Sequence, residues 1–131
     1  MSVPSLYGWE SVKAIREAFI EDYAGKVNEE EAAAFDADMK GLIVAVLDSS
    51  GYEESAHILF RRGRKLFEVE ASHCSCNGFE GQWSPEQVEW AQLAKRPKGW
   101  ISYDTKEACK YVEALVARRV RARSGDTGGG R

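Results

Sequence analysis

Two segments near the start of the chain show the apolar spacing of amphipathic helices. Between residues 9 and 23 the apolar positions recur every three or four residues, and Gly25 follows as a stop. This stripe consists of Val12, Ile15, Phe19 and Tyr23. A second helix is predicted between Asn28 and Gly41, because Asn28 with Glu31 three residues later matches a capping box. Its buried side would be Ala32, Phe35 and Met39.

Three strand-like segments follow these helices. Leu42 to Leu47 is continuously apolar, which predicts a central strand buried on both faces. Residues 55–60 and 65–71 alternate apolar and polar positions and are separated by a short turn around Gly63. Two alternating segments joined in this way predict an antiparallel β-hairpin.

The second half of the chain predicts two more helices. The sequence from Ser84 to Gln87 has the pattern of a helix start, and this helix is expected to end before Pro97. Trp83 would pack on Val88 and staple its first turn. Residues 100–103 predict a short edge strand, and a last helix follows them.

The elements therefore follow the order ααβββα(β)α, which is typical of an α+β fold. We expect a small antiparallel sheet of three to four strands, a meander with a hairpin, packed with four helices on one face. Residues 1–123 would form this single domain. Residues 124–131 contain only polar residues and glycine, so we expect a disordered tail.

The composition is that of an ordinary globular protein. Of 131 residues, 44% are hydrophobic and 30% are charged, and the longest apolar run is far below the roughly 18 residues that a membrane-spanning helix needs. Residues 1–5 lack the basic start and apolar stretch of a signal peptide. The odd number of cysteines, three, does not suggest a secreted disulfide framework. We therefore expect reduced thiols, a cytoplasmic location and no membrane partner.

Segment 72–83 combines more chemically distinctive side chains than any other part of the chain. Seven are candidate binding-surface residues: His73, Cys74, Cys76, Asn77, Phe79, Glu80 and Gln82. Ordered loops at strand ends often carry binding groups. The structural alternative is a rigid turn, in which Gly78 and Gly81 take positive φ angles and Phe79 and Trp83 pack into the core.

The thiols and imidazole of this loop leave two chemical interpretations open. Zinc prefers such ligands, and a zinc site would use His73, Cys74, Cys76 and His57. The Cys-x-Cys pair resembles the opening of a SWIM-type zinc finger, but the closing Cys-x-His half is missing, so no metal or other cofactor is favoured. Cysteine-dependent catalysis is the other interpretation, but no known enzyme signature surrounds these residues, and a non-enzyme is expected. Cys109 lies in an apolar stripe and is predicted to be a core thiol.

Charge is unevenly distributed along the chain. Residues 1–60 contain twelve Asp and Glu and four Lys and Arg, a net charge of −8, whereas residues 61–131 contain nine and fourteen, a net charge of +5. The hairpin turn and the end of the last helix contain the candidate basic patch: Arg61, Arg62, Arg64, Arg118, Arg119, Arg121 and Arg123. If the two clusters are adjacent in space, they form a candidate phosphate-binding site. Arginines near a helix C-terminus also have a structural explanation, because their positive charge interacts favourably with the helix dipole.

Residues 65–85 resemble a group of small uncharacterised proteins from tailed bacteriophages and prophages. The shared positions are Leu66-Phe67-Glu68-Val69, Ser72-His73-Cys74-Ser75-Cys76, Gly78, Glu80-Gly81-Gln82-Trp83 and Pro85. Asn77 and Phe79 stand where that group would have Tyr and Leu. The resemblance covers roughly residues 42–90. It implies a phage origin, and hence the cytoplasm of a host cell, but it implies no activity.

Together these features predict a small phage accessory protein that acts as a non-enzymatic binding module for a host or phage macromolecule. Its contact surface would be segment 72–83 and the helix that follows. The partner is expected to be a protein. The alternatives are a zinc-stabilised small domain, for which nucleic acid is a candidate partner, and a cysteine-dependent enzyme.

Overall fold

A mixed sheet of five strands forms the centre of the α+β fold in the computed structural model, which describes residues 5–22, 24–50, 53–74, 78–102 and 105–129. The strands are β1 (Ser5–Tyr7), β2 (Leu42–Ser50), β3 (Glu53–Arg62), β4 (Lys65–His73) and β5 (Glu86–Val88). The helices are α1 (Val12–Ile20), α2 (Glu29–Met39), α3 (Trp90–Ala94) and α4 (Lys106–Gly129). The strands lie side by side in sequence order, with β1 parallel to β2 and the other neighbours antiparallel.

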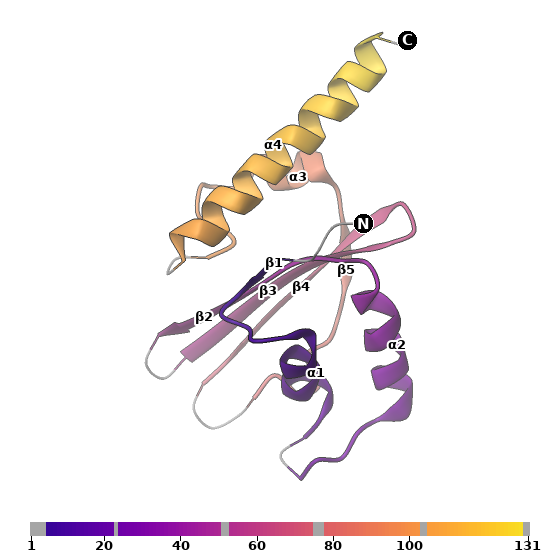
Figure 1. Cartoon of the computed structure of the whole chain (residues 1–131), viewed down its shortest axis with the longest axis vertical. Coiled ribbons are helices and arrows are strands. Elements are labelled where there is room, and N and C mark those ends of the chain that lie inside the picture. The colour runs from indigo at the N-terminus through magenta and orange to yellow at the C-terminus, as the bar shows by residue number, and fades with distance from the viewer. Residues whose placement is uncertain (1–4, 23, 51–52, 75–77, 103–104, 130–131) are drawn as a thin grey trace.

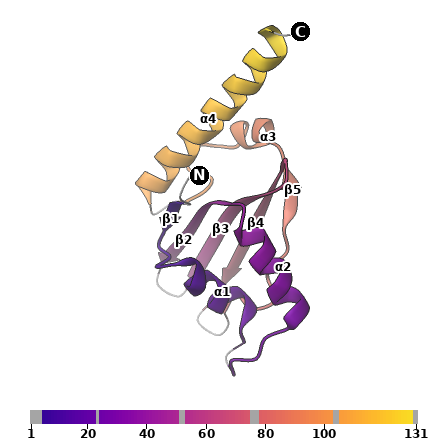
Figure 2. The same ribbon diagram turned by 45° about the vertical axis from the view of Figure 1, so that its right-hand side comes forward.

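Helices cover both faces of this sheet, so the fold has three layers. Helices α1 and α2 lie against one face, and α3 and α4 lie against the other (Figures 1 and 2). Each face has its own apolar core, one built around Phe19, Phe35 and Phe60 and the other around Val44, Leu59 and Val112. The α+β class and the four helices are confirmed, whereas the expectation that all helices pack on one face is wrong.

The hairpin of β3 and β4 is confirmed, and its pleat sorts the side chains onto the two faces. Arg62 pairs with Lys65 across a turn that contains Gly63, whose φ angle is 61°. The core beneath α1 and α2 receives Ala56, Ile58, Phe60, Phe67, Val69 and Ala71. His57 and Leu59, at the alternate positions, point to the opposite face.

Strand β2 is buried on both faces, as its apolar run predicts. Its register with β3 shifts between Leu42 and Val44. Because of this irregularity, Leu42 and Ala45 both enter the core beneath α1 and α2, while Val44 and Val46 enter the other core.

Helix α2 begins where the sequence predicts, whereas α1 begins at Val12, three residues after the predicted start at Trp9. The Asn28 side chain accepts a hydrogen bond from the backbone N–H of Glu31, at 3.0 Å, and so caps α2. Ser11 caps α1 in the same way through the N–H of Ala14, at 3.1 Å. Ile15, Phe19, Ala32 and Phe35 are buried as predicted, and Val12 and Met39 are partly buried against the same core. Tyr23 lies outside the described residues.

The helix predicted from Ser84 does not form there. The chain stays extended as β5 along β4, and the helix begins only at Trp90. A later capping pair, in which the Glu89 N–H donates to Gln92 Oε1 at 2.7 Å, sets this start. Burial explains the choice, because the extended backbone places Val88 and Trp90 in the core beneath α3 and α4.

The structure contains a strand, β1, that the sequence did not predict. Conversely, the edge strand predicted at residues 100–103 does not form, because residues 100–102 lie in consecutive turns. Residues 103 and 104 lie outside the described part of the chain. Helix α4 continues to Gly129, so its backbone runs through most of the segment expected to be a tail. The domain boundary at residue 123 stays a prediction.

A buried carboxylate joins α2, the hairpin and the segment before β5. Asp38 is only 3% exposed. It accepts hydrogen bonds from Arg62 Nε at 2.7 Å, from Arg62 Nη2 at 3.0 Å and from Trp83 Nε1 at 3.1 Å. The Trp83 ring packs among three phenylalanine rings, Phe19, Phe35 and Phe60. Its burial is therefore confirmed, but the expected staple on Val88 is wrong, because Val88 belongs to the core on the other face.

We expect Trp83→Ala to lower the free energy of unfolding by about 3–5 kcal/mol, because it leaves a cavity among the phenylalanine rings. Trp83→Phe keeps most of the apolar volume but removes a donor from a buried carboxylate, so we expect a loss of about 2 kcal/mol. Urea unfolding of both variants measures these losses. A chain truncated after residue 123 is the control and should unfold like the full chain. Wild-type stability in both Trp83 variants would contradict this assignment.

Candidate functional site

The 72–83 segment contains a turn that is stabilised by hydrogen bonds between its own residues. The Gln82 side-chain amide donates to Ser72 O at 2.9 Å and accepts from Ser72 N at 3.2 Å. It thus forms the pair of hydrogen bonds that the backbone of a neighbouring strand would form. Phe79 is 2% exposed, and the Gln82 N–H donates to its carbonyl at 3.0 Å. Gly81 takes the expected positive φ of 79°, whereas Gly78 does not. At Gly78 a side chain would instead meet the Glu80 carboxylate, which accepts from the Gly78 N–H at 3.2 Å.

His73 ties this turn to the sheet. Its Nε2 lies 2.8 Å from Glu54 Oε1 on β3, and its Nδ1 lies 2.7 Å from the Cys74 carbonyl oxygen. The ring also packs edge-on against Phe79, with 4.4 Å between ring centroids. Burial lowers the pKa of His73, but the hydrogen bonds to Cys74 and Glu54 outweigh it and raise the pKa above 6.5.

Three of the five predicted binding-surface residues that the structure describes are therefore engaged in contacts within the fold. His73, Phe79 and Gln82 hold the turn in place, while Cys74 and Glu80 have exposed side chains. Cys76 and Asn77 lie outside the described residues. The rigid-turn interpretation of this segment agrees with these contacts.

The two histidines considered for zinc do not converge. His57 and His73 project from opposite faces of the sheet, because His57 contacts Trp100 while His73 contacts Phe79. Within the described residues, no group of three or more His, Cys, Asp and Glu side chains could hold a metal ion. Cys109 packs in the core beneath α4, and its thiol donates to the Ser102 carbonyl at 2.9 Å. Burial raises the pKa of this thiol.

The two arginine clusters meet in space. Arg61 and Arg64 of the hairpin and Arg119 of α4 line one groove of about 430 Å³. Leu66, Trp90 and Ala122 complete the lining, and the Arg119 guanidinium lies 5.8 Å from the Trp90 ring centroid. We refer to this site as the arginine groove. It joins two segments that are more than fifty residues apart in the sequence.

The arginine groove is strongly positive. Partial burial, followed by repulsion from Arg61 and Arg118, lowers the pKa of Arg119. Among the described residues, no ion pair includes Arg61, Arg64 or Arg119. The same holds for Arg118 and Arg121 of α4.

Arg62 does not belong to this groove. It projects to the other face, pairs with Asp38 and stacks over the Phe67 ring, with 4.5 Å from its guanidinium carbon to the ring centroid. The side chain of Arg123 lies outside the described residues. Of the seven arginines predicted for the basic patch, the fold brings Arg61, Arg64 and Arg119 together and places Arg118 beside them.

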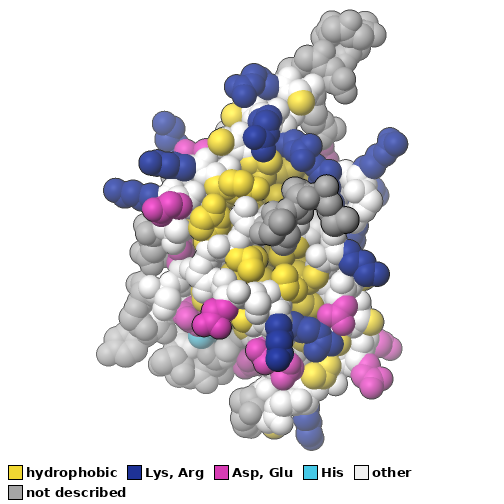
Figure 3. Space-filling model, in the orientation of Figure 1, with side chains coloured by type: hydrophobic (Ala, Val, Ile, Leu, Met, Phe, Trp, Pro, Cys, Tyr) yellow, Lys and Arg dark blue, Asp and Glu magenta, His cyan; other side chains and the backbone are white. Residues whose placement is uncertain are grey.

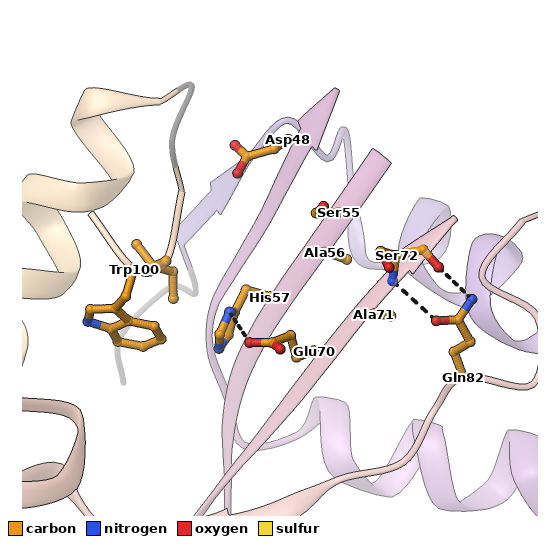
Figure 4. A pocket seen from close by; sticks show the side chains of 10 residues that line it. Asp48, Ser55, Ala56, His57, Glu70, Ala71, Ser72, Gln82 and Trp100 are labelled. Carbon is orange, nitrogen blue, oxygen red and sulfur yellow. Dashed lines mark hydrogen bonds and ion pairs between the residues drawn. The ribbon is translucent and has the colours of Figure 1, made fainter. Parts of the chain in front are cut away.

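A second hollow, which the sequence analysis did not predict, lies at the other end of the hairpin. This polar pocket of about 410 Å³ is lined by residues from β2, β3 and β4 and by Trp100 (Figure 4). Its polar lining includes Asp48, Ser55, His57, Glu70, Ser72 and Gln82. The sequence prediction missed it because the face that carries these residues was expected to be exposed to solvent.

An ionic cluster supports the wall of the polar pocket. Glu68 accepts from Arg96 Nη1 at 2.8 Å and Nη2 at 2.6 Å, and from His57 Nε2 at 2.8 Å. Arg96 in turn lies 4.7 Å from the Trp100 ring centroid. Burial alone would raise the pKa of Glu68, but its hydrogen bonds to Arg96 and His57 lower it to about 2.

No protein-family model, curated protein or solved structure matches this chain. Among the described residues, no helix combines the length and the apolar character needed to cross a bilayer.

The stability contributed by His73 should fall as the pH rises. Because its pKa is higher in the folded than in the unfolded chain, the charged ring stabilises the fold fully below about pH 6.5, and this contribution is lost as the pH rises through the folded pKa. Urea unfolding between about pH 6 and pH 8 should show a wild-type decline that His73→Gln lacks. Parallel pH curves for the two proteins would contradict the role of the Glu54 contact.

Glu68 should contribute in the opposite direction. Its folded pKa of about 2 lies below the ordinary value of 4.5, so its contribution is present above about pH 4.5 and is lost as the pH falls toward 2. We expect Glu68→Gln to lower the free energy of unfolding by about 2 kcal/mol at neutral pH, where a charged hydrogen-bond acceptor is lost. The difference from wild type should shrink in acid-unfolding experiments. Glu86→Gln, on the exposed edge strand, is the control and should behave as wild type.

Proposed function

We propose that this chain is a non-enzymatic binding module whose ligand is the phosphate backbone of a nucleic acid, held in the arginine groove. The observation that carries the proposal is the convergence of Arg61, Arg64 and Arg119 in one concave site without acidic partners among the described residues. Guanidinium groups bind phosphate oxygens through paired hydrogen bonds, and phosphate neutralisation supplies most of the affinity in sequence-independent binding.

The distribution of charge over the molecule supports this ligand despite a net charge of −3. The acidic first half of the chain includes α1 and α2, which cover one face of the sheet. The basic second half includes α4, which covers the other face, and the hairpin turn, which lies at one end of the sheet. Most Lys and Arg side chains in Figure 3 gather along and beside α4, and most Asp and Glu side chains lie in the opposite half. A polyanion approaching the α4 side therefore meets a positive surface.

The 72–83 segment is less suited to be the principal contact surface. Its His, Phe and Gln side chains are engaged in contacts that hold the turn, so they are not free to bind a partner. A protein partner at this segment is the competing outcome. The phage origin suggested by the sequence resemblance is compatible with either ligand, and the proposal does not depend on it.

Binding to a fluorescein-labelled 20-nucleotide single strand and to its duplex, measured by anisotropy at about 50 mM salt, tests the proposal. The affinity should fall with salt, with a slope in log–log form of about 0.7 to 0.9 per phosphate contacted. Arg64→Glu/Arg119→Glu should weaken binding at least about tenfold and reduce the slope by roughly two contacts.

Lys13→Glu/Lys26→Glu is the matched control, because it changes the net charge equally at residues near α1, across the sheet from α4. This control should lose far less affinity than the arginine variant. Equal losses in the two variants would mean that only the overall charge matters. Absence of binding at about 50 mM salt would refute the proposal and favour a protein partner.

A further inference from the structure

A cleft between α3 and α4 lies next to the arginine groove and has a volume of about 220 Å³. We refer to it as the helix cleft. Apart from three charged residues, its lining is apolar and consists of Leu93, Ala94, Pro97, Trp100, Val116 and Ala117. Leu93 and Val116 are buried, whereas Ala94, Pro97 and Ala117 are exposed, so the cleft is open to solvent. Sites that enclose a whole small molecule measure about 300–1,000 Å³, so the helix cleft fits one planar group of a larger ligand.

The helix cleft continues the arginine groove along the same pair of helices. Trp90 of α3 and Arg119 of α4 line the arginine groove. Leu93 and Val116, about one turn away on each helix, line the helix cleft. One helical turn is about 5.4 Å long, so the two sites are immediate neighbours. A ligand that spans both sites therefore contacts arginines with one part and apolar side chains with the next.

Three charged side chains contribute to the lining of the helix cleft. Arg96 is held by two hydrogen bonds to Glu68, and its guanidinium carbon lies 4.7 Å from the Trp100 ring centroid. Lys98 is exposed, and no ion pair among the described residues includes it. Glu113 accepts a backbone hydrogen bond at 3.2 Å. The lining thus offers a cation to phosphate oxygens and a carboxylate to N–H donors.

We propose that the helix cleft binds one base of a single-stranded nucleic acid whose phosphates lie in the arginine groove. The inference rests on the proposed function and adds to it that the bound strand is single. A nucleobase has apolar faces that stack on aromatic rings and guanidinium planes, and it has N–H donors on its edge. It therefore matches the Arg96–Trp100 stack and the Glu113 carboxylate. In a duplex the bases are stacked and paired, so they cannot enter the helix cleft.

The surrounding charge favours a nucleotide over an apolar side chain of a protein partner. The arginine groove on one side and Lys98 in the cleft place positive charge beside the apolar lining. A nucleotide combines a planar ring and a phosphate in one repeating unit, whereas an apolar side chain supplies no negative charge. A protein side chain in the helix cleft is the competing outcome of the test.

A strand without bases tests the inference. The probes are a fluorescein-labelled oligothymidylate of 20 nucleotides, a strand with the same number of phosphates in which every nucleotide is a tetrahydrofuran abasic site, and a duplex of the same length. Binding is measured by anisotropy at about 50 mM salt. Stacking of one base on protein side chains corresponds to at least about fivefold in affinity, so the abasic strand should bind at least about fivefold more weakly than the oligothymidylate.

Ala117→Leu narrows the helix cleft from an exposed position of α4, and leucine is a good helix former, so the fold should persist. This variant should weaken oligothymidylate binding at least about fivefold and leave the binding of the abasic strand and the duplex unchanged. Ala114→Leu, at an exposed position of α4 that is not part of the cleft lining, is the matched control and should bind all three probes as the wild type does.

Equal affinity of the wild type for the oligothymidylate and the abasic strand would overturn the inference, and so would equal behaviour of the two leucine variants. In both cases binding of the abasic strand would leave the proposed function intact, and a protein side chain would become the better occupant of the helix cleft. If none of the three probes binds, both the inference and the proposed function are refuted.

Discussion

Asp38 would be an unfavourable residue at its position if it did not have its three hydrogen bonds. It lies near the C-terminal end of α2, where the helix dipole is negative, and it is almost fully buried. Arg62 and Trp83 supply the donors, and each comes from a different part of the chain. A charge left without partners in a core costs several kcal/mol, so α2, the hairpin end and the 72–83 turn have to come together. The other features of the molecule depend on this junction, because it sets where the hairpin ends and where the chain turns toward β5.

The same junction separates Arg62, which is paired inside the fold, from the arginines of the arginine groove. Neighbouring residues on a strand point to opposite faces, so Arg62 is directed to Asp38 while Arg61 is directed to the side of α4. Because Arg61 and Arg62 are adjacent on the strand, the Arg62 guanidinium is neutralised by Asp38, while the Arg61 guanidinium faces the arginine groove. Arg16 with Asp36 and Arg96 with Glu68 are likewise paired. The cations of the arginine groove differ from them because the acidic helix α2 lies across the sheet.

Local patterns predicted the parts of the fold that depend on neighbours in sequence. The helix cap at Asn28, the hairpin around Gly63 and the buried positions of α1 follow from spacing alone. The Ser84 pattern failed because burial of Val88 and Trp90, which depends on α4, outweighed a local capping preference. The polar pocket was missed for a related reason. The continuously apolar β2 already required a cover on both faces, and applying that requirement to β3 and β4 would have placed His57 and Glu68 beneath a second layer.

The β3–β4 hairpin is the common frame of the two hollows. The arginine groove lies at its turn, and the polar pocket lies near its open end, about six residues away along β3, or roughly 20 Å. Phe60 and Phe67 stack on one face between these ends, and Leu59 packs on the other, so the intervening sheet is fixed from both sides. Coupling between two sites requires an element with two arrangements that both ligands bias. The described part of this sheet is packed on both faces and offers no such element, so a ligand in the arginine groove should leave the polar pocket unchanged.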